Sequence, residues 1–191
     1  MEAFSDGVIA VLITILVLEL HAPQGSEWHA LRLVLPGFLA YALSFVFLGI
    51  YWNNHHHMLQ LTDRVNGAIL WANLHLLFWL SLIPFVTAWM GQHPLTPAPT
   101  ALYGAVLFLA GFAYTILEQL IIADQGAQSP LKAAVGRDLK AKLSVFLCIV
   151  AIPLALFAPI AADAVFVCVA LTWLVPDRRI ERHIAAARGE S

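Results

Sequence analysis

The first twenty residues contain the feature that most limits what this chain can fold into. An uncharged run separates Asp6 from Glu19, and Thr14 is its only polar side chain. At about 1.5 Å of rise per helical residue, the whole apolar block of residues 4–20 spans about 25 Å, close to the thickness of a hydrocarbon core of roughly 30 Å. We interpret it as a membrane-spanning helix rather than a signal peptide, because no basic residues precede it.

The same apolar character extends along the whole chain. Of its 191 residues, 61% are apolar and only 12% are charged, and the apolar residues fall in long blocks. This composition indicates a polytopic membrane protein. The blocks cover about residues 4–20, 31–52, 68–90, 101–123, 143–158 and 160–175. The weakest break lies near Pro159 and Asp163, and a kink there instead of a turn would reduce the helix count to five.

The basic residues predict an orientation, because Lys and Arg near helix ends stay on the cytoplasmic side. Of the ten basic residues, all except Arg32 follow the second, fourth or sixth block. They are Arg64, Lys132, Arg137, Lys140, Lys142, Arg178, Arg179, Arg182 and Arg188. The predicted fold is an all-α membrane protein with six transmembrane helices and both termini cytoplasmic. Residues 1–177 form the transmembrane unit and 178–191 a short basic tail, in a multi-pass protein of the cell membrane.

Several functional classes are disfavoured by what the sequence contains. A net charge of −2 without a basic stripe argues against nucleic acid binding. Cys148 and Cys168 lie inside apolar blocks, where a disulfide framework is not expected. The chain has neither H-E-x-x-H nor G-x-S-x-G, and no paired acids at helical spacing within the blocks. We therefore expect no enzymatic activity.

Two groups of residues in the first block have simple structural explanations. Val11, Ile15 and Leu18 share one narrow stripe of a helix with Thr14 at its edge, which by spacing alone fits lipid contact or packing. Ser5 and Asp6 suit the start of a helix, where a hydroxyl caps and an acid complements the helix dipole.

Three consecutive histidines, His55, His56 and His57, follow the second block. On a helix they point about 100° apart, so they cannot all bind one metal, and we expect no metal site there. One of them is expected to meet Asp6 across a helix interface, in a network whose strength depends on pH through the histidine charge. The sequence leaves open which one.

Other polar groups lie within or beside the blocks. Asn73 and His75 are expected to make hydrogen bonds in packing, and Glu118 to need a neutralising partner or a protonated state. Glu19 follows the apolar stripe of the first block near His21. It is either a solvated acid or part of a ring that concentrates cations at a pore mouth.

Two strings carry a resemblance to a known family. The first is Phe4-Ser5-Asp6-Gly7 followed by Val8-Ile9-Ala10-Val11 and closing with Val17-Leu18-Glu19-Leu20, and the second is Trp52-Asn53-Asn54-His55-His56-His57. They are similar to two signatures of the prokaryotic members of the transmembrane protein 175 family of potassium channels. With six apolar blocks, the resemblance covers the whole chain.

The resemblance implies a potassium-permeable cation channel without cofactors and without the TVGYG filter, a string that this sequence lacks. It also implies a homotetramer, because the chain shows no internal duplication, with first helices lining a central pore. Carried over by position, Val11, Ile15 and Leu18 match the apolar constrictions, and Thr14 matches a hydroxyl implicated in selecting potassium. Phe4, Ser5 and Asp6, with His55, His56 and His57, would form a structural and gating network.

One residue of the family pattern falls outside this sequence. The pattern places an Arg four positions before the Phe, which is one position ahead of Met1. Either the sequence starts after this Arg or this member lacks it; if it is lacking, Arg64 is the candidate for the contact with Asp6 and the histidines.

A different class stays open as the alternative. His75, Glu118 and Asp6 could serve as relay groups of a proton-coupled secondary transporter, or protons could pass through the same pore. Such transporters often have inverted repeats or broken helices, and neither is visible in the sequence.

Overall fold

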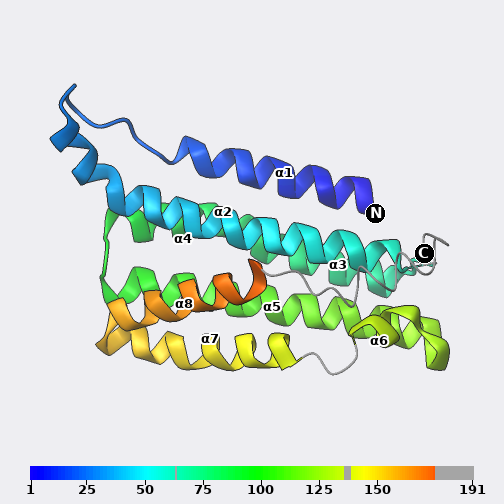
Figure 1. The fold of residues 1–191 in the computed structure, drawn as a ribbon. Helices are drawn as coiled ribbons and strands as arrows, with labels where there is room; N and C mark the ends of the chain where they lie inside the picture. Colours follow the sequence, from blue (N-terminus) through cyan, green and yellow to red (C-terminus); the bar gives the residue numbers. More distant parts are fainter. Residues whose placement is uncertain (63, 136–138, 175–191) are drawn as a thin grey trace, which may run out of the picture.

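The computed structural model describes residues 1–62, 64–135 and 139–174, and every regular element in these ranges is helical (Figure 1). The α-helices are α1 Glu2–Leu18, α2 Leu31–Gln60, α3 Gly67–Ser81, α4 Ile83–Gln92, α5 Pro97–Gln125, α6 Pro130–Val135, α7 Leu139–Phe157 and α8 Pro159–Leu174. Two 3₁₀ turns, Trp28–Ala30 and Gly126–Gln128, precede α2 and follow α5. The predicted all-α class is confirmed, and the expected tail at 178–191 lies outside the described residues.

Three helical segments among the described residues are long and apolar enough to cross a bilayer. They are Trp28–Gln60, Gly67–Gln92 and Pro97–Gln125, and the last two α-helices are shorter and also apolar. The crossing of a membrane by all six blocks stays a prediction.

The six apolar blocks match the helices with two differences. The third block is two helices, because α3 ends at Ser81 and α4 begins at Ile83 with Pro84 in its first turn, where no backbone N–H is available. The second helix is longer than its apolar block, which ends at residue 52: α2 continues through Asn53 to Gln60. Its polar side chains find partners on neighbouring helices there.

The weak break near Pro159 is a turn between two helices. The chain leaves helical structure at Ala158, and α8 packs back against α7 (Figure 1). The indole N–H of Trp173, near the end of α8, donates to the Ser144 hydroxyl near the start of α7 over 2.8 Å. The two helices are therefore antiparallel neighbours.

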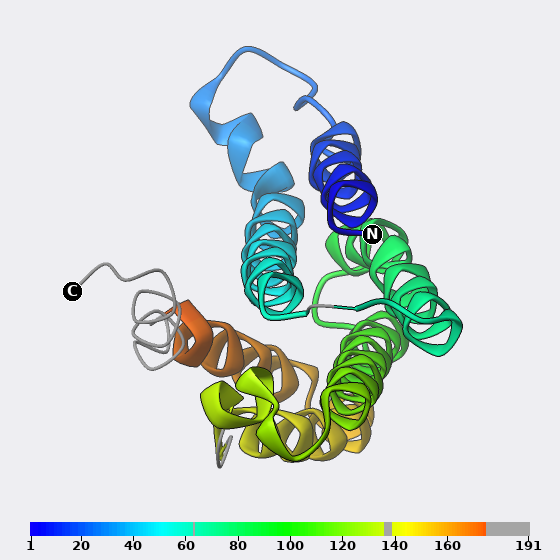
Figure 2. The ribbon, with the colours of Figure 1, turned by 90° about the vertical axis from the view of Figure 1, so that its right-hand side faces the viewer.

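The helices run side by side along one long axis (Figures 1 and 2). The start of α1, the end of α2 and the start of α3 lie at one end of the bundle, which we call the His end because it contains His55–His57. Viewed along the axis, α1 occupies an edge and contacts α2, α3 and α4 (Figure 2). Its buried side chains Ile9, Leu12 and Leu16 face these neighbours.

Close approaches between helices depend on glycine. A Cβ atom on Gly91 of α4 would lie 2.9 Å from the Gly37 Cα atom of α2. A Cβ atom on Gly104 of α5 would lie 2.6 Å from the Phe166 ring of α8. Small residues of this kind let helix backbones pack closely when lipid offers no hydrophobic driving force between helices.

Candidate functional site

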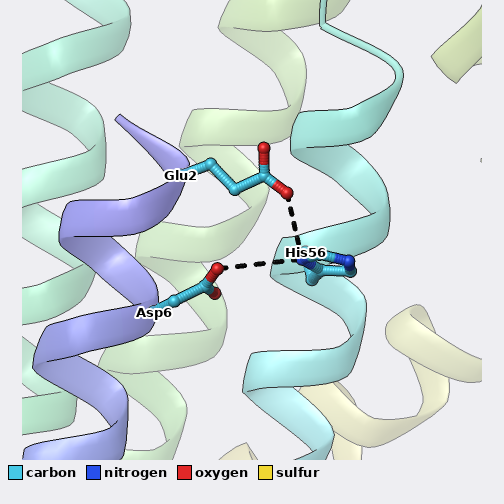
Figure 3. Close-up of side chains that lie close together, drawn as sticks. All are labelled: Glu2, Asp6 and His56. Carbon is cyan, nitrogen blue, oxygen red and sulfur yellow. Dashed lines mark ion pairs between the residues drawn. The ribbon is translucent and has the colours of Figure 1, made fainter.

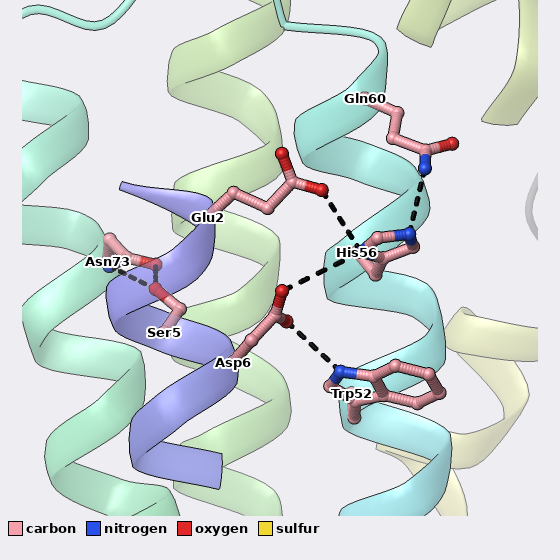
Figure 4. A network of polar contacts seen from close by, with 7 residues as sticks. All are labelled: Glu2, Ser5, Asp6, Trp52, His56, Gln60 and Asn73. Atoms are coloured by element: carbon pink, nitrogen blue, oxygen red, sulfur yellow. Dashed lines mark hydrogen bonds and ion pairs between the residues drawn. The ribbon is translucent and has the colours of Figure 1, made fainter. Parts of the chain in front are cut away.

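A polar network joins α1, α2 and α3 at the His end (Figure 4). Successive residues on a helix point about 100° apart, so the first turns of α1 present Ser5 and Asp6 to different neighbours. Ser5 meets α3, and Asp6 meets α2. The network therefore has a buried part around Ser5 and a half-exposed part around Asp6.

The buried part consists of Ser5, His55 and Asn73, whose exposed fractions are 0%, 0% and 2%. The Asn73 amide donates to the Ser5 hydroxyl over 2.9 Å, and its carbonyl oxygen lies 2.7 Å from His55 Nε2. Because a carbonyl oxygen can only accept, the hydrogen of neutral His55 lies on Nε2. One amide of α3 thus ties α1 to α2 inside the bundle.

The half-exposed part is centred on Asp6. The indole N–H of Trp52 donates to Asp6 Oδ1 over 3.0 Å, and His56 Nδ1 lies 3.8 Å from Asp6 Oδ2. The rings of Trp52 and His56 stack one helical turn apart, with centroids 5.7 Å apart. The sequence leaves open which of the three histidines meets Asp6, and in the structure it is His56.

Two further side chains complete this part. Glu2 lies one turn before Asp6 on α1, and its Oε1 atom is 3.1 Å from His56 Nδ1. The Gln60 amide donates to His56 Nε2 over 2.8 Å. His57 and Phe4 are the remaining members of the predicted network. The His57 ring is tilted against the His56 ring. The Phe4 side chain is 58% exposed.

The apolar stripe of α1 faces away from the chain's own core. Val11 is 55% exposed and Leu18 76% exposed, Thr14 is also exposed, and Ile15 is half-buried. The opposite face of α1 holds the buried residues. The stripe predicted from spacing is therefore left uncovered by this chain, available to water, lipid or another subunit.

The hydroxyl of Thr14 donates to the Val11 carbonyl over 2.7 Å. Its hydrogen is thereby used within the helix, and the hydroxyl oxygen keeps an acceptor site on the exposed face. Glu19 caps the other end of α1 and lines a cavity of about 490 Å³ between α1, α2 and α4, together with His21.

The other polar residues within the apolar helices have packing partners. The expected hydrogen bonds of Asn73 and His75 are confirmed: Asn73 belongs to the network, and His75 Nε2 accepts from the Trp79 indole on the same helix over 2.9 Å. Glu118 is 9% exposed and accepts from Gln119 over 3.4 Å. It borders a mostly apolar cavity of about 130 Å³ between α2, α5, α7 and α8.

The proposed contact of Arg64 with Asp6 is wrong. Among the described residues, the partners of Asp6 are Trp52 and His56. Because α2 continues to Gln60, Arg64 falls beyond its end in an exposed connection to α3.

Sequence reasoning missed the network roles of Glu2 and Gln60 and the position of Asn73 between Ser5 and His55. The signal was spacing: Glu2 precedes Asp6 by four residues, and Trp52 and Gln60 flank His56 by four on either side. Residues at this spacing share one helix face. The partner of Asn73 comes from a different helix, and no local pattern indicates it.

Comparisons with known proteins connect this arrangement to a family. The model of the family described as "Endosomal/lysosomal potassium channel TMEM175" matches residues 1–84, which include the whole network. A curated potassium channel of Chryseobacterium sp. (strain P1-3) is 50% identical over 184 residues, covering 96% of each chain. A potassium channel of Streptomyces collinus is 35% identical over 124 residues, covering 61% of this chain and 60% of its own.

A solved structure agrees with these relatives. The crystal structure of a lysosomal potassium-selective channel TMEM175 homolog from Chamaesiphon minutus superimposes with a TM-score of 0.80 at 26% identity. The match covers 91% of this chain and 94% of the other.

Proposed function

Because the chain belongs to the TMEM175 family of ion channels, which are not enzymes, we propose that it conducts potassium passively through a pore lined by α1. The observation that carries this proposal is the uncovered stripe of α1 at the edge of the bundle. A helix that lines a shared central pore must leave such a face free of its own subunit. Four copies arranged around the stripe would enclose the path.

In the proposed assembly, Val11, Ile15 and Leu18 form successive apolar rings. Rings of branched aliphatic side chains close a pore by narrowing it and excluding water. Small tilts or rotations of α1 would open it. Potassium sheds its hydration shell more readily than sodium, so a narrow ring favours potassium without carbonyl ligands.

Thr14 is the second group, after the apolar rings, that we propose contributes to the preference for potassium over sodium. Its hydroxyl hydrogen is used by the Val11 carbonyl, which leaves the oxygen to face a passing cation. At the far end, four copies of Glu19 would raise the local cation concentration at the mouth.

The network at the His end holds α1 in position in this account. Ser5 and Asp6 fix its start against α3 and α2 through groups that the bundle orients. The described basic residues Arg64, Lys132, Lys140 and Lys142 belong to segments at the same end, which supports a cytoplasmic His end in the cell membrane (Figure 1). Both termini would then be cytoplasmic.

Flux through reconstituted liposomes tests the proposal. A channel gives potassium flux that follows an imposed voltage, does not saturate and continues when the proton gradient is abolished. Flux that stops when a proton or sodium gradient is removed would identify a coupled transporter instead. Protein-free liposomes are the control for leak.

Alanine substitutions then test the rings. We expect Val11→Ala, Ile15→Ala and Leu18→Ala to change conductance or the preference for potassium over sodium. Val167→Ala and Leu171→Ala are matched controls, because these exposed apolar residues lie on α8. Unchanged conductance and preference in all three α1 variants would contradict the proposed constrictions.

A further inference from the structure

We propose that Glu2, Asp6 and His56 form a binding site for a divalent transition-metal ion, of which Zn²⁺ is the representative. The two carboxylates lie one turn apart on α1, and the imidazole reaches them from α2 (Figure 3). His56 Nδ1 is 3.1 Å from Glu2 Oε1 and 3.8 Å from Asp6 Oδ2. All three candidate ligand atoms lie within 4.8 Å of one another.

These separations suit a shared metal ion. Zinc binds histidine nitrogen and carboxylate oxygen at about 2.0–2.2 Å, so ligands around one ion lie roughly 3–3.6 Å apart. The distances from His56 to Glu2 and Asp6 are already close to this range. The two carboxylates need only small side-chain rotations to complete a three-ligand set, and water would fill the remaining positions.

Gln60 donates to Nε2, so neutral His56 carries its ring hydrogen on Nδ1, and a bound metal ion would take the place of that hydrogen. His56 Nδ1 is shielded from solvent and makes no hydrogen bond within the described part of the chain, although Glu2 lies beside it. It points into the space between the two carboxylates (Figure 3). This set uses one histidine and two acids, so it differs from the three-histidine site that helical geometry excludes.

Neighbouring side chains orient the ligands from behind (Figure 4). The Trp52 indole N–H holds Asp6 Oδ1, which leaves Oδ2 directed at His56. Gln60 contacts His56 Nε2 on the ring edge opposite the metal position. Metal binding at Nδ1 places the ring hydrogen on Nε2, where a half-turn of the Gln60 amide presents its oxygen as the acceptor. Supporting contacts of this kind fix ligand orientation in metal sites.

Charge and ligand type define the class of ion. Two carboxylates and a neutral imidazole carry two negative charges, which a divalent cation balances. Calcium prefers six to eight oxygens, and magnesium keeps an octahedral shell of oxygens, whereas mixed nitrogen and oxygen ligands suit zinc and its first-row neighbours. Because the ligands come from two helices, the ion would tie α1 to α2.

Calorimetry with the full-length protein in detergent tests the site after chelator treatment. We expect wild type and His29→Gln to bind one Zn²⁺ per chain with equal affinity. His29 is exposed in the 3₁₀ turn before α2, away from the His end. Glu2→Gln and His56→Gln should each weaken binding by about tenfold or more.

Two further measurements distinguish loss of the metal site from loss of the fold in these variants. Zn²⁺ should raise the unfolding temperature of wild type and His29→Gln but not of Glu2→Gln, because only the folded site binds the ion. Co²⁺ bound to wild type should give a ligand-field absorption spectrum that Glu2→Gln lacks. Glu2 lies half-exposed in the first turn of α1, so its replacement by glutamine preserves the fold.

Equal Zn²⁺ binding by all four proteins would mean an adventitious ion only and would overturn the proposal. Absence of stoichiometric binding by wild type would overturn it equally. Neither result depends on potassium flux, so a failure here is distinguishable from a failure of the conduction proposal.

Discussion

The indole N–H of Trp52 donates to the Asp6 carboxylate over 3.0 Å, and this bond joins the second helix to the first turns of α1. Trp52→Phe removes the donor and keeps an aromatic ring in place. We expect it to destabilise the protein by about 1 kcal/mol, because a bond to a charged acceptor at a partly exposed site is worth about that much. Unfolding followed by circular dichroism measures the effect.

The control for this prediction is Trp71→Phe. Trp71 lies on α3 and is 75% exposed. Its replacement should change stability little, and equal effects of the two substitutions would contradict a specific role for the Trp52 bond.

The bond between Ser5 and Asn73 predicts a measurable coupling. Either Ser5→Ala or Asn73→Ala leaves a buried polar partner unsatisfied, at a cost of about 1–3 kcal/mol. The double variant should cost less than the sum of the single variants, by roughly 1 kcal/mol. Titration with a denaturing detergent gives the free energies of unfolding, and strictly additive effects would contradict direct coupling.

Gly91 should tolerate no side chain. A Cβ atom there would lie 2.9 Å from the Gly37 backbone, so Gly91→Ala must push α4 away from α2. We expect a loss of about 1–3 kcal/mol of stability, as for other overpacked helix contacts. Gly49→Ala is the control, since nothing lies within 4 Å of the added atom. It should be neutral or stabilising, because alanine favours helix.

Much of this fold could be predicted from the sequence, because helices of this apolar kind appear in a sequence as long uncharged runs. The turn between α7 and α8 and the exposed stripe of α1 both follow from local patterns of apolar and polar residues. The division between α3 and α4 was missed, although Pro84 marks it. Hydropathy does not change where one apolar helix ends and another begins.

The network could be predicted only in part. The histidine run and Asp6 were found, since polar residues beside a membrane helix stand out. The choice of His56, the role of Asn73 and the exclusion of Arg64 depend on how far α2 extends and how α3 packs. These are properties of the tertiary arrangement, which a local pattern does not contain.

Thr14→Val tests the proposed selection by the hydroxyl oxygen. Valine has nearly the same shape but offers no acceptor, so we expect the permeability ratio of potassium to sodium to fall. Reversal potentials under bi-ionic conditions measure it. Thr115→Val is the matched control, because Thr115 is exposed on α5 and its hydroxyl donates to the Gly111 carbonyl of its own helix. A lower ratio in both variants, or in neither, would contradict the assignment.

Access of a water-soluble thiol reagent to α1 tests the central claim most directly. Leu18→Cys is made in a background with Cys148 and Cys168 replaced by alanine, and potassium flux is followed during methanethiosulfonate treatment. We expect flux through Leu18→Cys channels to be blocked and flux through Val167→Cys channels, altered on α8, to be unaffected. Continued flux through treated Leu18→Cys channels, with its thiol unreacted, would place the stripe against lipid and contradict the α1-lined pore.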